Sequence, residues 1–173
     1  AVSAVLRGMG DSRHPLIFVG VAAVVNGGHL MQPYVVSDII APDGSVVKHV
    51  EPTEVRQVIS EQTSERCRTI LEGVVDGGTG KNARVAGYRI GGKTATSEKL
   101  PRSLKKYISS FIGFAPAEDP QVIALVTIDE PVGVYYGGTI AAPVIADLFQ
   151  NILPYLGIPA EAGETVSGFG ISG

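Results

Sequence analysis

The clearest pattern of apolar and polar positions in the chain is helical and runs from about residue 61 to residue 76. Its apolar positions follow the i, i+3, i+4, i+7, i+8 spacing of an amphipathic helix. They are Cys67, Ile70, Leu71, Val74 and Val75. Ser60 precedes the first turn, where its hydroxyl can cap free backbone N–H groups, and Gly77-Gly78 follows the last turn. The pattern predicts a helix from 61 to 76 with Ser60 as its N-cap.

Two further segments have helical patterns. The longest uninterrupted apolar run covers residues 16–25, between Pro15, which suits a first helical turn, and Asn26-Gly27-Gly28. A buried helix is predicted at 15–26, because a membrane-spanning helix needs about 20 apolar residues. A last helix is predicted from about Thr139. Its apolar stripe comprises Ala142, Ile145, Leu148, Phe149, Ile152 and Leu156.

The other patterned segments are extended. Residues 34–40 and 45–50 flank Pro42-Asp43-Gly44, a turn sequence that predicts a β-hairpin. Longer strands are predicted at 88–96, 107–115 and 121–129. Five residues join the last two, a length that suits an antiparallel hairpin, and the almost wholly apolar third segment predicts a central strand covered on both faces. An antiparallel sheet with packed helices, an α+β fold, is therefore expected.

The composition indicates one folded unit and excludes several classes of function. Of the 173 residues, 45% are hydrophobic and 18% are charged, which is enough apolar material for a core. The net charge is only −3, with no run of Lys and Arg and no Trp, so no nucleic-acid partner is expected. The three histidines share no metal-ligand spacing, and we expect neither a metal nor a cofactor. The Gly-rich segment 160–173 predicts a loose tail.

The segment 91–97 combines a lysine, hydroxyl groups and small residues on a predicted strand. The period of two places Lys93 and Ala95 on one face, and Thr94 and Thr96 on the other. Beside a cleft, backbone N–H groups and hydroxyls of this strand would hold a carboxylate or a developing oxyanion, with Lys93 supplying a positive field. The alternative is a polar edge strand with a solvated lysine. The segment by itself leaves both interpretations open.

A nucleotide site is a further alternative. Residues 87–94 (Gly87 to Thr94) satisfy the phosphate-loop pattern G-x-x-x-x-G-K-[ST], and the apolar segment 123–128 leads into Asp129, as a Mg²⁺-binding acid would require. A phosphate loop, however, must enter a helix whose N-terminus faces the phosphates. The residues after Thr94 have no apolar helical stripe and soon reach Pro101, so the context opposes this interpretation.

The segment Lys93-Thr94-Ala95-Thr96 resembles the Lys-Thr-Gly-Thr element of penicillin-binding proteins and serine β-lactamases. Other segments resemble class B penicillin-binding proteins in the same order along the chain. They are Asn26-Gly27-Gly28, 77–83, 85–90, 110–117, Asp129-Glu130-Pro131, 135–138 and Ala141-Ala142-Pro143. The resemblance covers about residues 8–158 and is closest to the Gram-positive division and sporulation type.

This resemblance implies a serine D,D-transpeptidase that cross-links peptidoglycan stem peptides through an acyl-enzyme and binds β-lactams. It implies that Lys93 supports the serine–lysine network and that the hydroxyls of Thr94 and Thr96 bind the substrate carboxylate. The N–H of Thr96 would be one of two oxyanion donors. Ala95 occupies the substrate-binding position where the family has glycine, and its methyl group is expected to crowd the acyl group or move the strand.

The family also carries Ser-x-x-Lys followed by Ser-x-Asn, and no such pair precedes Lys93 here. A Ser-x-x-Lys at 103–106 follows the predicted strand and is interpreted as a basic turn. We therefore expect residues 1–173 to be the C-terminal portion of a transpeptidase domain, without its nucleophile and prone to self-association. The parent protein would lie on the extracytoplasmic face of the bacterial membrane, anchored by a segment absent from this chain, with other cell-wall synthesis proteins as partners. A non-catalytic module of the same family is the alternative.

Overall fold

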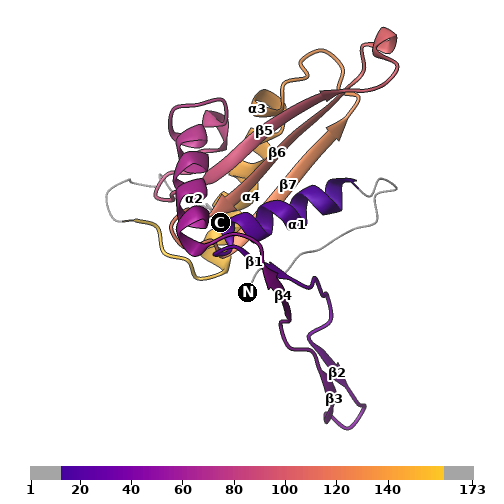
Figure 1. The fold of residues 1–173 in the computed structure, drawn as a ribbon, viewed down its shortest axis with the longest axis vertical. Coiled ribbons are helices and arrows are strands. Elements are labelled where there is room, and N and C mark those ends of the chain that lie inside the picture. Colours follow the sequence, from indigo (N-terminus) through magenta and orange to yellow (C-terminus); the bar gives the residue numbers. More distant parts are fainter. Residues whose placement is uncertain (1–12, 162–173) are drawn as a thin grey trace, which may run out of the picture.

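A three-stranded antiparallel sheet forms the centre of the molecule. The computed structural model describes residues 13–161. The sheet has the order β5-β6-β7, and its strands are β5 (Gly91–Glu98), β6 (Tyr107–Ala115) and β7 (Val122–Asp129). Helix α1 (Arg13–Val25) lies across one face and α4 (Ala142–Tyr155) lies on the other, as Figure 1 shows. The predicted α+β fold with an antiparallel sheet is confirmed.

The alternation of side chains along β6 divides the core into two clusters. Phe111 packs with Ile145 and Phe149 on the α4 face, whereas Phe114 packs with Val25 on the α1 face. The prediction of a central strand at 121–128 is wrong, because β6 occupies the centre and is buried along most of its length. The apolar run of β7 instead reflects a strand whose residues are mostly half-buried.

Helix α2 (Glu61–Asp76) begins and ends where the pattern predicts. The Ser60 hydroxyl accepts the Thr63 N–H at 3.2 Å, which confirms the N-cap. The predicted apolar stripe is wrong at Ile70, which is 69% exposed, while Ser64 is fully buried. The Ser64 hydroxyl donates to the carbonyl of Val24 at 2.6 Å. The buried face of α2 is therefore partly polar because it satisfies carbonyl groups at the C-terminus of α1.

Two short two-stranded sheets follow α1. The predicted hairpin is confirmed, with β2 (Asp38–Ile40) paired to β3 (Val46–His49). The second pair, β1 (His29–Met31) with β4 (Glu54–Gln57), was not predicted, since both strands are shorter than the usual strand. Every residue of β2 and β3 is exposed, and this hairpin projects away from the sheet in Figure 1.

The predicted last helix is divided into α3 (Gly137–Ile140) and α4. The fully buried positions of α4 include Ile145, Phe149 and Leu153, so the predicted stripe is wrong at Leu148 and Leu156, which are exposed. Short 3-10 turns occur at η1 (Lys81–Ala83) and η2 (Arg102–Leu104).

Most of the predicted loose tail at 160–173 lies outside the described residues. Just before this segment, the carbonyl of Ile158 accepts the Tyr88 hydroxyl at 3.0 Å. At its start, the Glu161 N–H donates to the carbonyl of Gly87 at 2.8 Å. Within residues 13–161, no helix has the length and apolar content that crossing a membrane requires.

Candidate functional site

The outer edge of β5, opposite β6, presents the backbone groups of Thr94 and Thr96. The Lys99 N–H donates to the carbonyl of Lys106 at 2.7 Å, directly after the register pair Glu98↔Tyr107. In an antiparallel pair, the backbone groups of alternate residues bond to the partner strand. This bond therefore shows that the odd-numbered residues of β5 are the ones whose N–H and C=O groups bond to β6. The N–H and C=O groups of Thr94 and Thr96 therefore point to the outer edge.

The side chains of these two threonines lie on the face that carries α3 and α4. Thr94 is paired with Phe111, which packs against α4, and the Thr94 hydroxyl lies 3.2 Å from the Thr79 hydroxyl. The Thr96 hydroxyl accepts the N–H of Gly137 at 3.1 Å. Thr94 and Thr96 thus share one face, as the alternation predicts, and each is held by a group from another segment.

Lys93 places a positive charge at the same edge. Its Nζ donates to the carbonyl of Thr94 at 2.8 Å, and that carbonyl points outward. Ala95 also has an exposed side chain, paired across the sheet with Ser110. A short run of β5 therefore combines a cation, hydroxyl groups and outward N–H groups, which is an arrangement suited to an anion.

Helix α3 approaches β5 so closely that its first two residues leave no room for side chains. A Cβ at Gly137 would lie 2.2 Å from the carbonyl oxygen of Ser110 and 2.6 Å from that of Ala95. A Cβ at Gly138 would lie 2.3 Å from the carbonyl oxygen of Thr79. Glycine at both positions is what allows the Gly137 N–H to reach the Thr96 hydroxyl.

Charged side chains connect the C-terminal ends of β5 and β7 with the N-terminal end of β6. Lys99 Nζ lies 2.8 Å from Asp129 Oδ1 and 2.8 Å from Glu130 Oε1, and Lys106 Nζ lies 2.6 Å from Glu130 Oε2. Hydrogen bonds to Asp129 and, to a smaller extent, to Glu130 raise the pKa of Lys99. Hydrogen bonds from Lys106 and, to a smaller extent, from Lys99 lower the pKa of Glu130. This cluster fixes the β5–β6 hairpin against the exit of β7.

The nucleotide-site interpretation of residues 87–94 is wrong. Residues 91–98 form a strand that continues into a hairpin, not a loop that enters a helix. Asp129, the supposed Mg²⁺ ligand, is bound to Lys99 instead. Among the residues that the structure describes, no cluster of His, Cys, Asp and Glu could hold a metal ion.

Neither Ser-x-x-Lys spacing in the chain lies in an α-helix, where residues three apart become neighbours. In the one at 103–106, Lys106 is bound to Glu130. Sequence reasoning overlooked the other, at 45–48. There, Ser45 donates to Asp43 Oδ1 at 2.6 Å in the hairpin turn, whereas Lys48 lies on β3. Neither serine is placed for activation by its lysine.

Three features beside β5 were missed as functional candidates, although the sequence carried a signal for two of them. The segments 77–83 and 135–138 were noted only for their resemblance, and they supply Thr79 and the Gly137 N–H. Tyr107 and Tyr135 stack with ring centroids 4.0 Å apart, directly before α3. No pattern in the sequence predicts this contact, because Tyr107 and Tyr135 lie on different segments.

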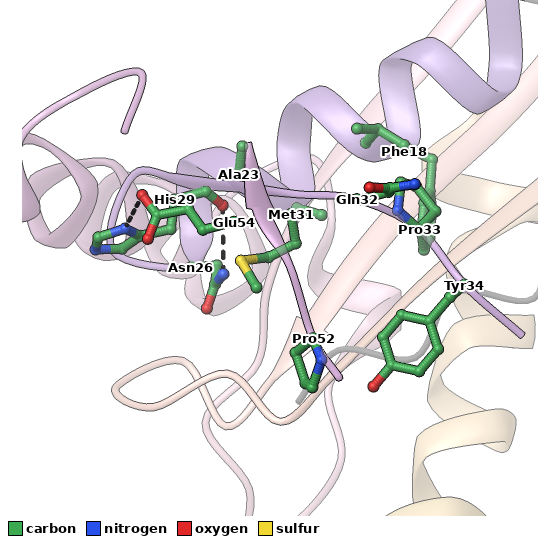
Figure 2. Close-up of a pocket in the computed structure, with 12 residues that line it drawn as sticks. Phe18, Ala23, Asn26, His29, Met31, Gln32, Pro33, Tyr34, Pro52 and Glu54 are labelled. Atoms are coloured by element: carbon green, nitrogen blue, oxygen red, sulfur yellow. Dashed lines mark hydrogen bonds and ion pairs between the residues drawn. The ribbon is translucent and has the colours of Figure 1, made fainter. Parts of the chain in front are cut away.

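A separate apolar cavity of about 400 Å³ lies between α1 and the β1–β4 pair. Phe18, Met31 and Tyr34 are among its lining residues, and none of the lining residues comes from β5 (Figure 2). At one end His29 Nδ1 lies 2.9 Å from Glu54 Oε1, an ion pair that joins the two strands when His29 is protonated.

Comparison with known proteins identifies relatives of this arrangement. The family described as the penicillin binding protein transpeptidase domain matches residues 17–150. The chain is 45% identical over 157 residues to stage V sporulation protein D of Bacillus subtilis. The aligned region covers 87% of the chain and 24% of that protein. The chain is 36% identical to the probable peptidoglycan D,D-transpeptidase PbpC of Pseudomonas aeruginosa, over 82% of the chain and 26% of that protein.

Solved structures have the same architecture. Penicillin-binding protein 3 of Mycobacterium tuberculosis, in complex with ampicillin, superposes with a TM-score of 0.73 at 26% identity, over 85% of this chain and 35% of that one. The D,D-transpeptidase domain of a peptidoglycan glycosyltransferase from Eggerthella lenta gives a TM-score of 0.71 at 33% identity, over 83% of this chain and 32% of that one. The chain thus spans about a quarter of the relatives' sequences and about a third of these structures.

Proposed function

We propose that the protein carrying this chain is a peptidoglycan D,D-transpeptidase and a target of β-lactams. This chain belongs to the penicillin-binding protein transpeptidase family. The observation that carries the proposal is the outer edge of β5. There Lys93 and the backbone and hydroxyl groups of Thr94 and Thr96 meet along four residues. A stem peptide ends in a carboxylate, and so does a penicillin, and this edge presents donors and positive charge to such a group.

In this proposal a serine attacks the carbonyl carbon of the D-Ala–D-Ala bond, and its proton passes to the departing D-Ala amine. An amine of a second stem peptide then displaces the serine from the acyl-enzyme. The outward N–H of Thr96 stabilises the oxyanion of each tetrahedral intermediate, and Lys93 supplies a positive field beside it. We place the nucleophile outside these 173 residues, since neither Ser-x-x-Lys spacing lies in an α-helix.

The substrate and the drug define where the protein works. Peptidoglycan is assembled outside the cytoplasmic membrane, so we place this edge on the extracytoplasmic side. We also propose that the protein is anchored in the membrane and that other cell-wall synthesis proteins are its partners. One relative is named for sporulation and another for D,D-transpeptidase activity. A role in sporulation and a role in division would both use this edge.

The test is acylation by a labelled penicillin, followed by intact mass. The complete protein is expected to gain the mass of one labelled penicillin, and unlabelled penicillin added first should prevent incorporation of the label. The 173-residue chain alone should gain none. An unlabelled complete protein would favour the non-catalytic alternative, in which Ala95 at the glycine position marks lost chemistry. An adduct on the isolated chain would refute our placement of the nucleophile.

Self-association of the isolated chain is a second expected result. The β2–β3 hairpin exposes Ile40 by 62% and Val47 by 67%, and a two-stranded hairpin is only marginally stable by itself. Replacing both residues by lysine should shift the chain towards monomer in analytical ultracentrifugation, because charges on strand edges oppose pairing. Val132→Lys, at a residue that is fully exposed in a loop, is the control and should leave the distribution unchanged. A monomeric unsubstituted chain at high concentration would contradict the prediction.

A further inference from the structure

The connection between α2 and β5 places a third hydroxyl, that of Thr79, against the proposed carboxylate-binding edge. Its oxygen lies 3.2 Å from the Thr94 hydroxyl. The backbone beside it is fixed, because the Gly80 N–H donates to the carbonyl of Val74 at 2.9 Å. A Cβ at Gly80 would also lie 2.9 Å from the ring of Phe111, the residue paired with Thr94. Packing therefore holds Thr79 beside Thr94.

The same connection is joined to α3. Asn82 Nδ2 donates to the carbonyl of Gly138 at 2.8 Å, and Gly138 in turn packs against the carbonyl of Thr79. The preceding residue, Gly137, donates its N–H to Thr96. Thr79 and the Gly137 N–H thus belong to one packed unit, which contacts both threonine hydroxyls of β5 from the α3 side.

These contacts determine how the two hydroxyls of β5 donate. A threonine hydroxyl has one hydrogen to donate and can accept at its oxygen. Thr96 accepts from Gly137, so its own hydrogen is directed to another acceptor. When the Thr94 hydroxyl donates its hydrogen to an anion at the edge, the Thr79 hydroxyl donates its own hydrogen to the Thr94 oxygen. Both threonines then receive a hydrogen bond from the protein, which makes each a stronger donor to the ligand.

We infer that Thr79 is a positioning residue that sets Thr94 as a donor and so makes the edge selective for a carboxylate. This inference rests on the proposed function. A carboxylate offers two acceptor oxygens and satisfies both threonine donors. A carboxamide offers one oxygen and an N–H₂ group, so that one threonine hydroxyl faces another donor. Thr79 itself makes no contact with the reacting atoms in the proposed mechanism.

The test compares acylation of the complete protein by a penicillin and by the same penicillin with its carboxylate converted to a carboxamide. Thr79→Val removes the hydroxyl while conserving shape and should slow acylation by the carboxylate form roughly 3- to 10-fold, the effect of one hydrogen bond. Acylation by the carboxamide should change less than about 2-fold. Thr79→Ser should restore the preference for the carboxylate. Thr69→Val on α2, whose hydroxyl donates to the Glu65 carbonyl of the same helix, is the matched control.

The preference is a ratio of two rates on one protein sample, so a reduced folded fraction in Thr79→Val leaves it unchanged. A loss of both rates by the same factor would show a structural role and overturn the inference. So would an unchanged preference in Thr79→Val, with the unsubstituted protein acylated normally. If the unsubstituted complete protein is not acylated at all, the proposed function fails and this inference fails with it.

Discussion

Replacing Lys93 by methionine is expected to slow acylation of the complete protein by a penicillin about 100-fold or more, comparable to the loss of an oxyanion-stabilising donor. Lys93 Nζ lies at the outward carbonyl of Thr94, so its charge is directed at the edge where the proposed carboxylate and oxyanion bind. Methionine keeps most of the length of the side chain and removes the charge together with the Nζ donor that bonds the Thr94 carbonyl. The rate constant of acylation, followed with a fluorescent penicillin, measures the effect.

Lys105→Met supplies the control for Lys93→Met. Lys105 is exposed in the turn between β5 and β6, away from the edge, and its replacement should leave the rate within about 2-fold of the unsubstituted value. A Lys93→Met protein that is acylated as fast as this control would show that the lysine is only a solvated surface charge. The role assigned to it in the proposed mechanism would then be withdrawn.

Replacing Gly137 by alanine should lower the free energy of unfolding by about 2 kcal/mol and slow acylation as well. The added Cβ would lie 2.2 Å from the Ser110 carbonyl oxygen, so α3 must move away from the sheet. This movement removes the N–H that Thr96 accepts. Chemical denaturation measures the stability and the rate of acylation measures the functional effect, both on the complete protein.

Gly73→Ala makes the same change on the exposed side of α2, where a Cβ would meet nothing within 4 Å. Alanine has the higher helix propensity, so this variant should gain roughly 0.5–1 kcal/mol. The two glycine substitutions are therefore expected to have opposite signs. Equal small effects at both positions would mean that α3 is not held against β5 as the structure describes.

The sequence predicts best the elements whose signals are local. Helix 61–76 has a cap, an amphipathic stripe and a terminating glycine pair, and its bounds are confirmed. The two long strands at 107–115 and 121–129 are likewise confirmed to within a residue, because a hairpin loop separates two apolar runs. The alternation of residues in β5 is by itself enough to place Thr94 and Thr96 on one face.

The parts that the sequence does not predict depend on contacts between distant segments. Ser64 is buried because its hydroxyl reaches Val24 on another helix, and no periodicity in α2 signals such a contact. The contact between Thr79 and Thr94 likewise requires the packing of α2 against the sheet. The outward direction of the Thr96 N–H follows only from the phase of the β5–β6 hydrogen bonds, which the bond from Lys99 to Lys106 fixes.

The proposed function depends on the edge from Lys93 to Thr96 being the place where a ligand carboxylate binds. A crystal structure of the complete protein acylated by a penicillin tests this most directly. We predict that the penicillin carboxylate lies within about 3 Å of the hydroxyl oxygens of Thr94 and Thr96. We also predict that the acyl carbonyl oxygen accepts the N–H of Thr96. A penicillin bound with its carboxylate away from β5 would contradict the proposed function.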